Sequence, residues 1–424
     1  MGQYITHFST RRISQIQSLN YNYFDELLYE YYFLLSQIQK EKEIKLENGE
    51  KKKIRAVIPK TVDELDFFLK DENNLIIIPT IEGASSLIDG NSYDIDNFDI
   101  DSILENVRTL KNLDFTPFFI TLSHHFYNGF CGHAKSLNSN LKKHNIVYRL
   151  INQKHRIDEG FNEKGIELVK CLLSIDEYSD CGKRILIDAK HLSIESRKTL
   201  YKIIKNHNKN NPNDIIPIIH SHTGYSGISS LDTLYKLNNL VKNLYYESYF
   251  FNPMSINITD EEIKIVFKSH GLIGLSLEEK IISGRGIIEN SKKYLYNEDN
   301  EVLKLFWAKQ ILRNIVGMAY SLITDSEIKD KENIWNIFAI GSDFDGFIDP
   351  VDGFVTSEEF PKLEKFLIRA LKSRNDFKKI NFGISAEQII EKIMYRNTYN
   401  FLLENLNKQT RKTKQPKMKV GNIE

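Results

Sequence analysis

The stretch Asn336-Ile-Phe-Ala-Ile-Gly-Ser-Asp-Phe-Asp-Gly346 contains the pattern from which we infer the fold. Residues 337–340 form a short apolar run of the kind that a strand buried on both faces of a sheet requires, and the run stops at Gly341. Asp343 and Asp345 follow directly. A carboxylate just past the C-terminal end of a buried strand lies at the edge of an α/β sheet where ligands bind, and burial there can shift its pKa.

Two other interpretations of this stretch have to be weighed. Asp343 could instead cap a helix that begins after a strand-to-helix turn, and the stretch alone leaves this alternative open. A calcium-binding EF-hand loop fits poorly, because Phe347 and Ile348 stand where such a loop needs a ligand and its invariant glycine.

Four apolar runs upstream end in the same way, and helical-looking segments separate them. Each run is followed by a residue type that binds metals or transfers protons. A (β/α) barrel presents its site in this manner, because each strand end contributes a side chain. The sequence therefore predicts an α/β fold of the TIM-barrel type. The runs are residues 75–78 before Ile81-Glu82-Gly83, 118–122 before Ser123-His124-His125, 185–187 before Asp188-Ala189-Lys190-His191, and 215–219 before His220-Ser221-His222.

Length and composition are those of an ordinary globular enzyme. At 424 residues, with 41% hydrophobic and 27% charged residues, the chain fits one large domain better than several small ones. Lys plus Arg and Asp plus Glu number 57 each, so no net field favours nucleic acid or an anionic membrane. Three cysteines cannot all pair, and Cys171 falls on the apolar face of a predicted helix, which favours a reducing compartment. Without a run of ~20 apolar residues or a signal-peptide core, we expect a cytoplasmic protein.

Periodicity and capping residues predict the other elements. Asn48-Gly49, within the weakly alternating residues 44–58, is a strong hairpin signal. Residues 272–277 read as a sixth strand without a ligand at its end. We expect residues 1–404 to form the barrel domain and residues 405–424 a basic, flexible tail. Helices are predicted over residues 11–40, 101–112, 163–178, 193–204, 302–323 and 385–404, and a longer helical excursion over residues 223–255. Capping boxes are predicted at Thr61/Glu64, Thr259/Glu262 and Ser385/Gln388.

Five strand-end motifs together resemble a known family. In chain order they are Ile81-Glu82-Gly83, Ser123-His124, the stretch from Leu186 to Ser193, the stretch from Pro217 to His222, and the stretch from Gly341 to Gly346. This set resembles the membrane (renal) dipeptidase family of binuclear zinc peptidases, a branch of the amidohydrolase-like TIM barrels. The match extends over roughly residues 76–403.

The resemblance implies a role for each matching residue. Glu82 is similar to the carboxylate that bridges the two zinc ions, and His191 and His222 are similar to the imidazole ligands of the second ion. His124 resembles the histidine that holds the substrate at its scissile carbonyl. Asp343 resembles the aspartate that moves the proton of the attacking water. Such a site would cleave the amide bond of a dipeptide or similar small substrate with a metal-activated water.

Some features depart from the family pattern. The His-x-Asp motif that ends the first strand and binds the first zinc has no counterpart, and six strand-like runs fall short of the eight of a closed barrel. Ser255-Ile256 stands where an arginine is expected to bind the substrate carboxylate, and the tyrosine expected near Leu277 is missing. Arg285 is a candidate substitute, although a solvent-facing loop arginine is the simpler interpretation. His220 would face the same way as His222 on a strand and is a candidate further ligand.

Two hypotheses of different classes follow. The first is a metallohydrolase of the membrane dipeptidase type that binds Zn²⁺, with one ion or none in this chain alone, and acts on a small peptide or amide. The second is a catalytically inactive or fragmentary barrel that lacks the ligands of the first metal. We expect no nucleic-acid or membrane partner. The candidate protein partners are a second copy of the chain and a separately encoded N-terminal segment, which would supply the missing strands.

Overall fold

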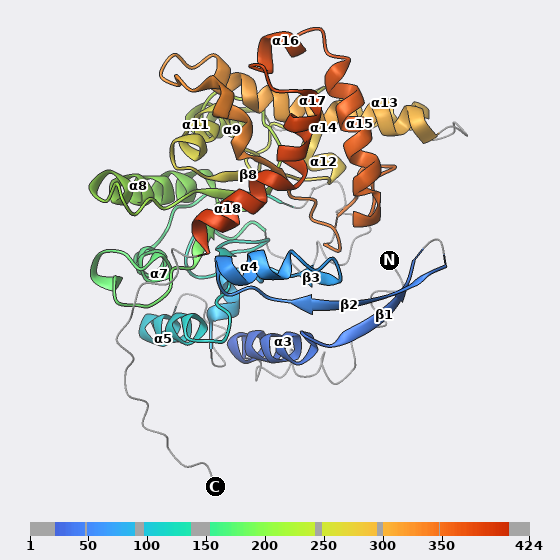
Figure 1. Cartoon of the computed structure of the whole chain (residues 1–424). Coiled ribbons are helices and arrows are strands. Elements are labelled where there is room, and N and C mark those ends of the chain that lie inside the picture. Colours follow the sequence, from blue (N-terminus) through green and yellow to red (C-terminus); the bar gives the residue numbers. More distant parts are fainter. Residues whose placement is uncertain are drawn as a thin grey trace.

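The structure of the protein is a computed structural model that describes residues 22–46, 49–89, 97–136, 153–241, 248–294, 300–346 and 348–406. It is a mixed α/β fold with a parallel sheet and a smaller, separate sheet (Figure 1). Among these described residues, no helix is both long and apolar enough to cross a membrane. The predicted basic tail falls on residues 407–424, which lie outside the described part of the chain.

Six parallel strands form the main sheet, which matches the predicted number of barrel strands. They pair in the order of the sequence, so each strand lies beside the next one along the chain. No pairing joins the first strand to the last within the described residues, so the sheet is open and a closed TIM-type barrel is not formed there. The strands are β4 (Ile81–Glu82), β5 (Phe119–Thr121), β6 (Leu186–Asp188), β7 (Ile219–Thr223), β8 (Leu272–Leu275) and β9 (Phe338–Ile340).

The first apolar run is divided between two sheets. The sequence predicts one strand over residues 75–78, but β3 (Asn74–Ile76) pairs with β2 of the small sheet, and only β4 joins the main sheet. Pro79 stands between the two strands and contributes only its carbonyl, which accepts a hydrogen bond from the Phe118 amide at 2.8 Å. Hydrophobicity alone cannot tell which of two neighbouring sheets a strand joins.

The small sheet contains the predicted hairpin. Strands β1 (Glu41–Lys45) and β2 (Lys51–Val57) are antiparallel, and β2 pairs with β3 in parallel. Helix α3 (Tyr23–Gln37) and helix α4 (Val62–Phe68) belong to this part of the molecule, drawn in blue in Figure 1. The helix predicted over residues 11–40 corresponds to α3, which begins after its N-cap Asn22 and ends at Gln37, whereas residues 1–21 lie outside the described part of the chain. Asn48 of the predicted turn also lies outside it.

Helices connect the strands of the main sheet and bury their apolar faces against it. Side-chain caps start several of them: Ser193 accepts from the Ser196 amide at the start of α8, and Thr259 and Glu262 form the predicted capping box of α11. Among the described residues of the excursion predicted over 223–255, residues 231–240 form the helix α9, and residues 224–230 and 248–255 are not helical. The connecting helices are α5 (Ile100–Lys111), α7 (Glu163–Leu173), α8 (Ile194–Asn210), α9 (Leu231–Leu240), α11 (Asp260–Lys268), α12 (Glu279–Ile282), α13 (Arg285–Ser291) and α14 (Asn300–Ile323).

The C-terminal helices hold the last strand in place. Asn397 at the start of α18 donates to the carbonyls of Trp335 and Phe338, at 2.7 and 2.8 Å, and so ties the helix to β9. The Ser385/Gln388 capping box begins α17 as predicted, and a π-helical turn continues the chain into α18. These helices are α15 (Phe360–Lys372), α16 (Phe377–Ile380), α17 (Ala386–Glu391) and α18 (Asn397–Asn405).

Candidate functional site

The five residues singled out from the sequence all stand at or beyond the C-terminal ends of strands of the main sheet. Glu82 is the last residue of β4, and His222 lies near the end of β7. His124, His191 and Asp343 each follow the last residue of their strand, β5, β6 and β9, by three positions. Parallel strands end at one edge of a sheet, so these side chains share that edge.

One carboxylate oxygen lies close to three imidazoles. The Glu82 Oε1 atom is 3.7 Å from Nε2 of His124, 3.5 Å from Nε2 of His191 and 3.6 Å from Nε2 of His222. The Nε2 atoms of His191 and His222 are 3.1 Å apart. One ligand atom each from Glu82, His124 and His191 lies within 4.8 Å of the other two, so these residues form a candidate metal-binding group.

A chain of hydrogen bonds orients the His222 imidazole. The Ser221 hydroxyl donates to Asp188 Oδ2 at 2.6 Å, which leaves the Ser221 oxygen free to accept from Nδ1 of His222 at 2.7 Å. We assign the proton to Nδ1 on this basis, so the lone pair of Nε2 faces Glu82. The Asp188 carboxylate also accepts hydrogen bonds from the Thr121 hydroxyl and from the amides of Lys190 and Ser221. These bonds hold the carboxylate in place, and it in turn orients Ser221 and the His222 imidazole.

The ends of β7, β8 and β9 approach one another closely around Ser221. A Cβ atom added to Gly274 on β8 would lie 2.0 Å from the Ser221 carbonyl oxygen, and one added to Gly341 after β9 would lie 1.8 Å from it. Only glycine fits at both positions. The close approach brings Asp343, two residues after Gly341, to the same edge as His222.

The imidazoles of the site are held neutral. Burial lowers the pKa of His191 and of His222 well below the usual value, and the nearby positive charge of Lys190 lowers it further. Burial also lowers the pKa of His124, against the opposing effect of the Glu82 carboxylate. A neutral imidazole has a free lone pair on one nitrogen, which is the form that binds a metal ion.

Asp343 has the properties of a proton acceptor near neutral pH. Burial raises its pKa to about 6, and the negative charge of Glu82 adds to this effect while Lys190 opposes it. Its φ is +63°, and that of His191 is +65°, so both adopt the left-handed conformation that side chains other than glycine rarely take. Such conformations cost about 1–3 kcal/mol each and are concentrated at functional sites.

His220 does not join the site, so its prediction as a further ligand is wrong. The pairing of β7 with β8 shifts register between His220 and Thr223, and this irregularity turns His220 and His222 in different directions. The Nε2 atom of His220 lies 2.8 Å from the hydroxyl of Tyr201 on α8. Alternation along a regular strand would have placed both imidazoles on one side.

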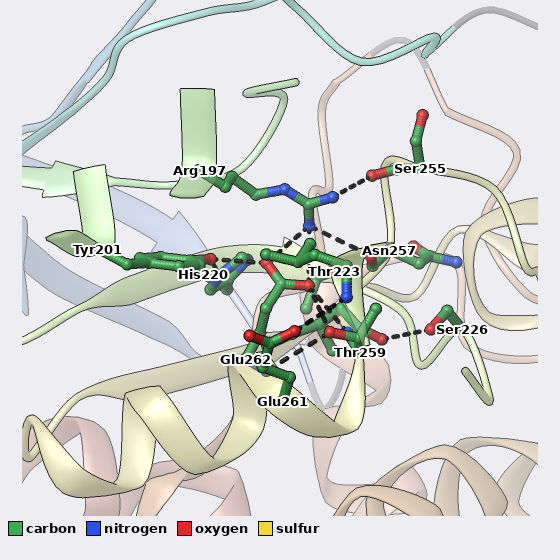
Figure 2. Close-up of polar contacts among 12 residues, drawn as sticks. Arg197, Tyr201, His220, Thr223, Ser226, Ser255, Asn257, Thr259, Glu261 and Glu262 are labelled. Atoms are coloured by element: carbon green, nitrogen blue, oxygen red, sulfur yellow. Dashed lines mark hydrogen bonds and ion pairs between the residues drawn. The ribbon is translucent and has the colours of Figure 1, made fainter. Parts of the chain in front are cut away.

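A buried network surrounds His220 behind the sheet (Figure 2). Arg197 on α8 forms an ion pair with Glu262 on α11 at 2.9 Å and donates to the carbonyls of Ser255 and Asn257 at 2.6 and 3.3 Å. The Tyr201 hydroxyl donates to Glu262 at 2.7 Å. The network joins α8, β7 and α11, and thereby fixes the strand that carries His222.

Sequence reasoning missed two charged residues at this edge. Lys190 directly precedes His191 and is 1% exposed, although lysine usually lies in solvent. Glu278 directly follows the apolar run 272–277, which was predicted to end without a ligand. Burial raises the pKa of Glu278 to about 7, and the positive charges of Lys280 and Lys190 are among the effects that oppose this rise. The signal for Glu278 was its place one residue after that run. Nothing in the spacing distinguished Lys190 from a solvated lysine.

Arg285 has the location of an ordinary surface residue. It begins α13, and its guanidinium lies 2.6 Å from Glu289 one helical turn later. The side chain is 47% exposed, as expected for a solvent-facing arginine.

Comparison with known proteins finds similar structures but no similar sequences. No protein-family model matches the chain, and no curated protein matches it. The solved structures that it resembles include a metallo peptidase from Rhodobacter sphaeroides liganded with a phosphinate mimic of the dipeptide L-Ala-D-Ala. The two chains are 16% identical with a TM-score of 0.48, and the alignment covers 83% of this chain and 69% of the peptidase. A dipeptidase described as a metallo peptidase has 15% identity and a TM-score of 0.47, with coverage of 84% and 71%. An amidohydrolase from Pseudomonas aeruginosa has 14% identity and a TM-score of 0.44, with coverage of 83% and 78%.

These solved structures are a metallo peptidase, a dipeptidase and an amidohydrolase. Likeness at this level of identity does not extend to function, since one fold serves many reactions. We therefore base the functional proposal on the residues of the site.

Proposed function

We propose that the protein is a metal-dependent hydrolase that cleaves the amide bond of a dipeptide or a similar small substrate. The observation that carries the proposal is the convergence of three imidazole Nε2 atoms, each 3.5–3.7 Å from one oxygen of Glu82. Neutral imidazoles beside a carboxylate, backed by a hydroxyl and a buried aspartate, are the donor set of a catalytic zinc site.

The residues present fit a divalent ion. Glu82, His191 and His222 would hold it, since the two imidazole nitrogens face each other and the carboxylate. Three protein ligands leave a coordination position open. A bound ion would supply a Lewis acid that polarises a carbonyl group and lowers the pKa of water. Zinc is the first choice for this mixture of nitrogen and oxygen donors.

His124 and Asp343 would act on the substrate. His124, whose side chain is 34% exposed, is the most accessible imidazole beside Glu82 and would hold the scissile carbonyl. Asp343, whose pKa is raised to about 6, is mostly ionised at neutral pH and would accept a proton from the attacking water and pass it to the leaving amine. The remaining hydrogen-bonded residues would keep the imidazoles in place.

The test combines hydrolysis of a dipeptide panel with metal analysis of the same samples. Asp343→Asn should lower kcat about 10²- to 10⁴-fold, the usual contribution of a general acid–base group, while metal content stays unchanged. His222→Ala should lose the metal as well as the activity. Asp345→Asn is the matched control, because Asp345 is an exposed carboxylate two residues from Asp343.

Three outcomes are informative. Retention of activity in the Asp343→Asn variant would remove Asp343 from the mechanism. Retention of metal in the His222→Ala variant would favour the alternative ligand set of Glu82, His124 and His191. A wild-type protein that binds zinc and hydrolyses none of the dipeptides would contradict the proposed reaction while leaving the metal site intact.

A further inference from the structure

Two of the three cysteines are in contact at the C-terminal end of helix α7. Cys171 is in the last turn of this helix, and Cys181 is in the loop that leads from it to β6. The two Sγ atoms are 3.3 Å apart, and both thiols are free. A disulfide requires a separation of about 2.05 Å between the sulfur atoms. A small movement of the two side chains would therefore bring the sulfurs to bonding distance.

The loop between the two cysteines is held against the end of α7. The helix ends at Ser174 in the left-handed conformation, with a φ of +54°, which turns the chain back. The Ser174 hydroxyl donates to the Gly182 carbonyl at 2.9 Å, and the Cys181 amide donates to the Tyr178 carbonyl at 3.0 Å. The contact between the thiols is thus fixed by the folded backbone on both sides.

A buried ammonium group is bound at the same turn. Lys111 on α5 is 2% exposed, and its Nζ atom donates to the Cys171 carbonyl and, at 2.7 Å, to the Ser174 hydroxyl. Burial raises the pKa of Cys171 to about 12, and the positive charge of Lys111 opposes that rise. A nearby cation favours the thiolate, which is the reactive form of cysteine. Apolar packing alone does not require a buried ammonium beside two thiols that touch.

We propose that Cys171 and Cys181 form a modification site, a dithiol that a peroxide oxidises reversibly to a disulfide. Cys181 is the thiol that a peroxide reaches first, because it is 5% exposed and follows the exposed residues Ser179 and Asp180, whereas Cys171 is fully buried. Disulfides inside reducing compartments are usually transient in this way. The inference goes beyond the proposed hydrolysis and does not depend on it.

The reaction proceeds in two steps that balance. The Cys181 thiolate attacks one oxygen of hydrogen peroxide, the O–O bond breaks, and a sulfenic acid forms; the hydroxide released takes up the proton that the thiol has lost. The Cys171 sulfur then attacks the sulfenic sulfur, the S–S bond forms and the S–O bond breaks. The leaving hydroxide takes the Cys171 proton. Two thiols and one peroxide molecule thus give one disulfide and two water molecules.

The disulfide would tie the end of α7 to the segment that enters β6. A cross-link removes conformations from the unfolded chain, so the oxidised protein should be more stable than the reduced protein. Both cysteines precede β6, whereas His191 follows the opposite end of this strand. The modification therefore acts on stability at a place separate from the candidate metal ligands.

The experiment treats the folded full-length chain with hydrogen peroxide and then counts its thiols. Catalase stops the reaction, and the protein is denatured, alkylated with N-ethylmaleimide and digested with trypsin, which releases both cysteines in the single peptide 171–183. We expect alkylation of all three cysteines before treatment and of Cys131 alone after it. Peptide 171–183 should then be lighter by two hydrogen atoms than the reduced, unalkylated peptide, and dithiothreitol should restore both thiols.

Cys131 provides the matched control, because its thiol is also fully buried but contacts the Asn128 side-chain oxygen, at 3.9 Å. Cys131→Ala should still form the disulfide, and its unfolding midpoint should rise on oxidation as in the wild type. Cys171→Ala should form none, and its midpoint should not rise; dimedone should trap the sulfenic acid left on Cys181. Circular dichroism establishes that each variant is folded before treatment.

The other outcomes overturn the proposal. Three alkylated thiols after peroxide treatment would show that the pair does not react in the folded protein. A disulfide that includes Cys131, or one between two chains on a non-reducing gel, would assign the reactivity to other thiol pairs. Formation of the 171–181 disulfide only after unfolding in urea would show that the contact in the folded structure is not its cause.

Discussion

Two buried polar clusters lie on either side of β7, and they differ in how completely their atoms are paired. In the network behind the sheet, the Glu262 carboxylate has partners on both oxygens, and Arg197 is unpaired only at Nε. At the strand ends, Lys190 Nζ, His191 Nδ1 and Ser123 Oγ are buried and have no partner among the described residues. Buried polar atoms in folded proteins are nearly always paired, so the second cluster is the exception.

This difference in pairing predicts that the two clusters contribute differently to the stability of the fold. A paired network contributes to folding, because removing any member leaves its partner buried and unsatisfied. An incompletely paired cluster with two left-handed residues is unfavourable for folding, and the rest of the structure holds it in place. Strand β7 connects the two clusters through His220 on one side and His222 on the other. The following predictions test this division through stability and metal binding.

The largest effect is expected from Arg197→Met, which breaks the paired network. The variant leaves the Glu262 carboxylate buried without its counter-charge, and breaking a buried ion pair in this way costs about 3–5 kcal/mol. Urea denaturation followed by circular dichroism measures the free energy of unfolding. Lys198→Met, one position along α8, is the matched control: its ion pairs with Glu195 and Asp232 are partly exposed, and such pairs contribute less than about 1 kcal/mol. Equal losses in the two variants would contradict the special role of the network.

Zinc binding should produce the next largest effect, and it acts on the other cluster. At a free zinc concentration of about 100 times Kd, the wild type should gain about 2.7 kcal/mol of stability. His191→Asn should abolish most of this gain, because the variant lacks an imidazole beside Glu82. The Arg197→Met variant should show the same zinc-dependent increment as the wild type if its midpoint can still be measured. Thermal unfolding with and without zinc tests this, and a full gain in His191→Asn would exclude His191 as a ligand.

The sequence indicated the strand ends because each follows an apolar run, a pattern that depends only on neighbouring residues. The strands that precede His124, His191 and Asp343 could be predicted in this way, whereas the run at residues 75–78 pairs with the small sheet and Glu82 lies on the separate strand β4. The direction of His220 could not be predicted, because the irregularity of β7 depends on its pairing with β8. Nor could the ion pair of Arg197 with Glu262, which joins side chains 65 positions apart. Lys190 was missed because neighbouring residues in the sequence do not distinguish a buried lysine from a solvated one, and this side chain is buried.

Tyr201→Phe should have a moderate effect, because it removes a single hydroxyl from the paired network. The hydroxyl contacts both Glu262 and His220, and phenylalanine retains the ring, so the loss reports on hydrogen bonding alone. Leaving buried groups unsatisfied costs about 1–3 kcal/mol, and we expect about 2 kcal/mol. Tyr395→Phe is the control, since that hydroxyl contacts Glu391 at the surface and its loss should cost less than about 0.5 kcal/mol. Equal effects would mean that burial does not strengthen these bonds.

The smallest effect at pH 6 is expected from Lys190→Met, the same change of a buried cation to methionine as in Arg197→Met. The Lys190 ammonium has no hydrogen-bond partner among the described residues, methionine fills the space of the lysine methylene groups, and neighbouring carboxyl groups can take up a proton in place of the lost charge. Glu278, whose pKa is raised to about 7, is the first such group, and removing the ammonium raises that pKa further. A carboxyl group with a raised pKa in the folded state contributes stability at low pH, and the contribution is lost as the pH rises through that pKa.

Lys190→Met should therefore be within about 0.5 kcal/mol of the wild type at pH 6 and less stable than the wild type at pH 8. The Arg197→Met variant should be destabilised at both pH values. Urea denaturation at the two pH values decides this: a loss in Lys190→Met at pH 6 as large as that in Arg197→Met would show that both clusters stabilise the fold in the same way.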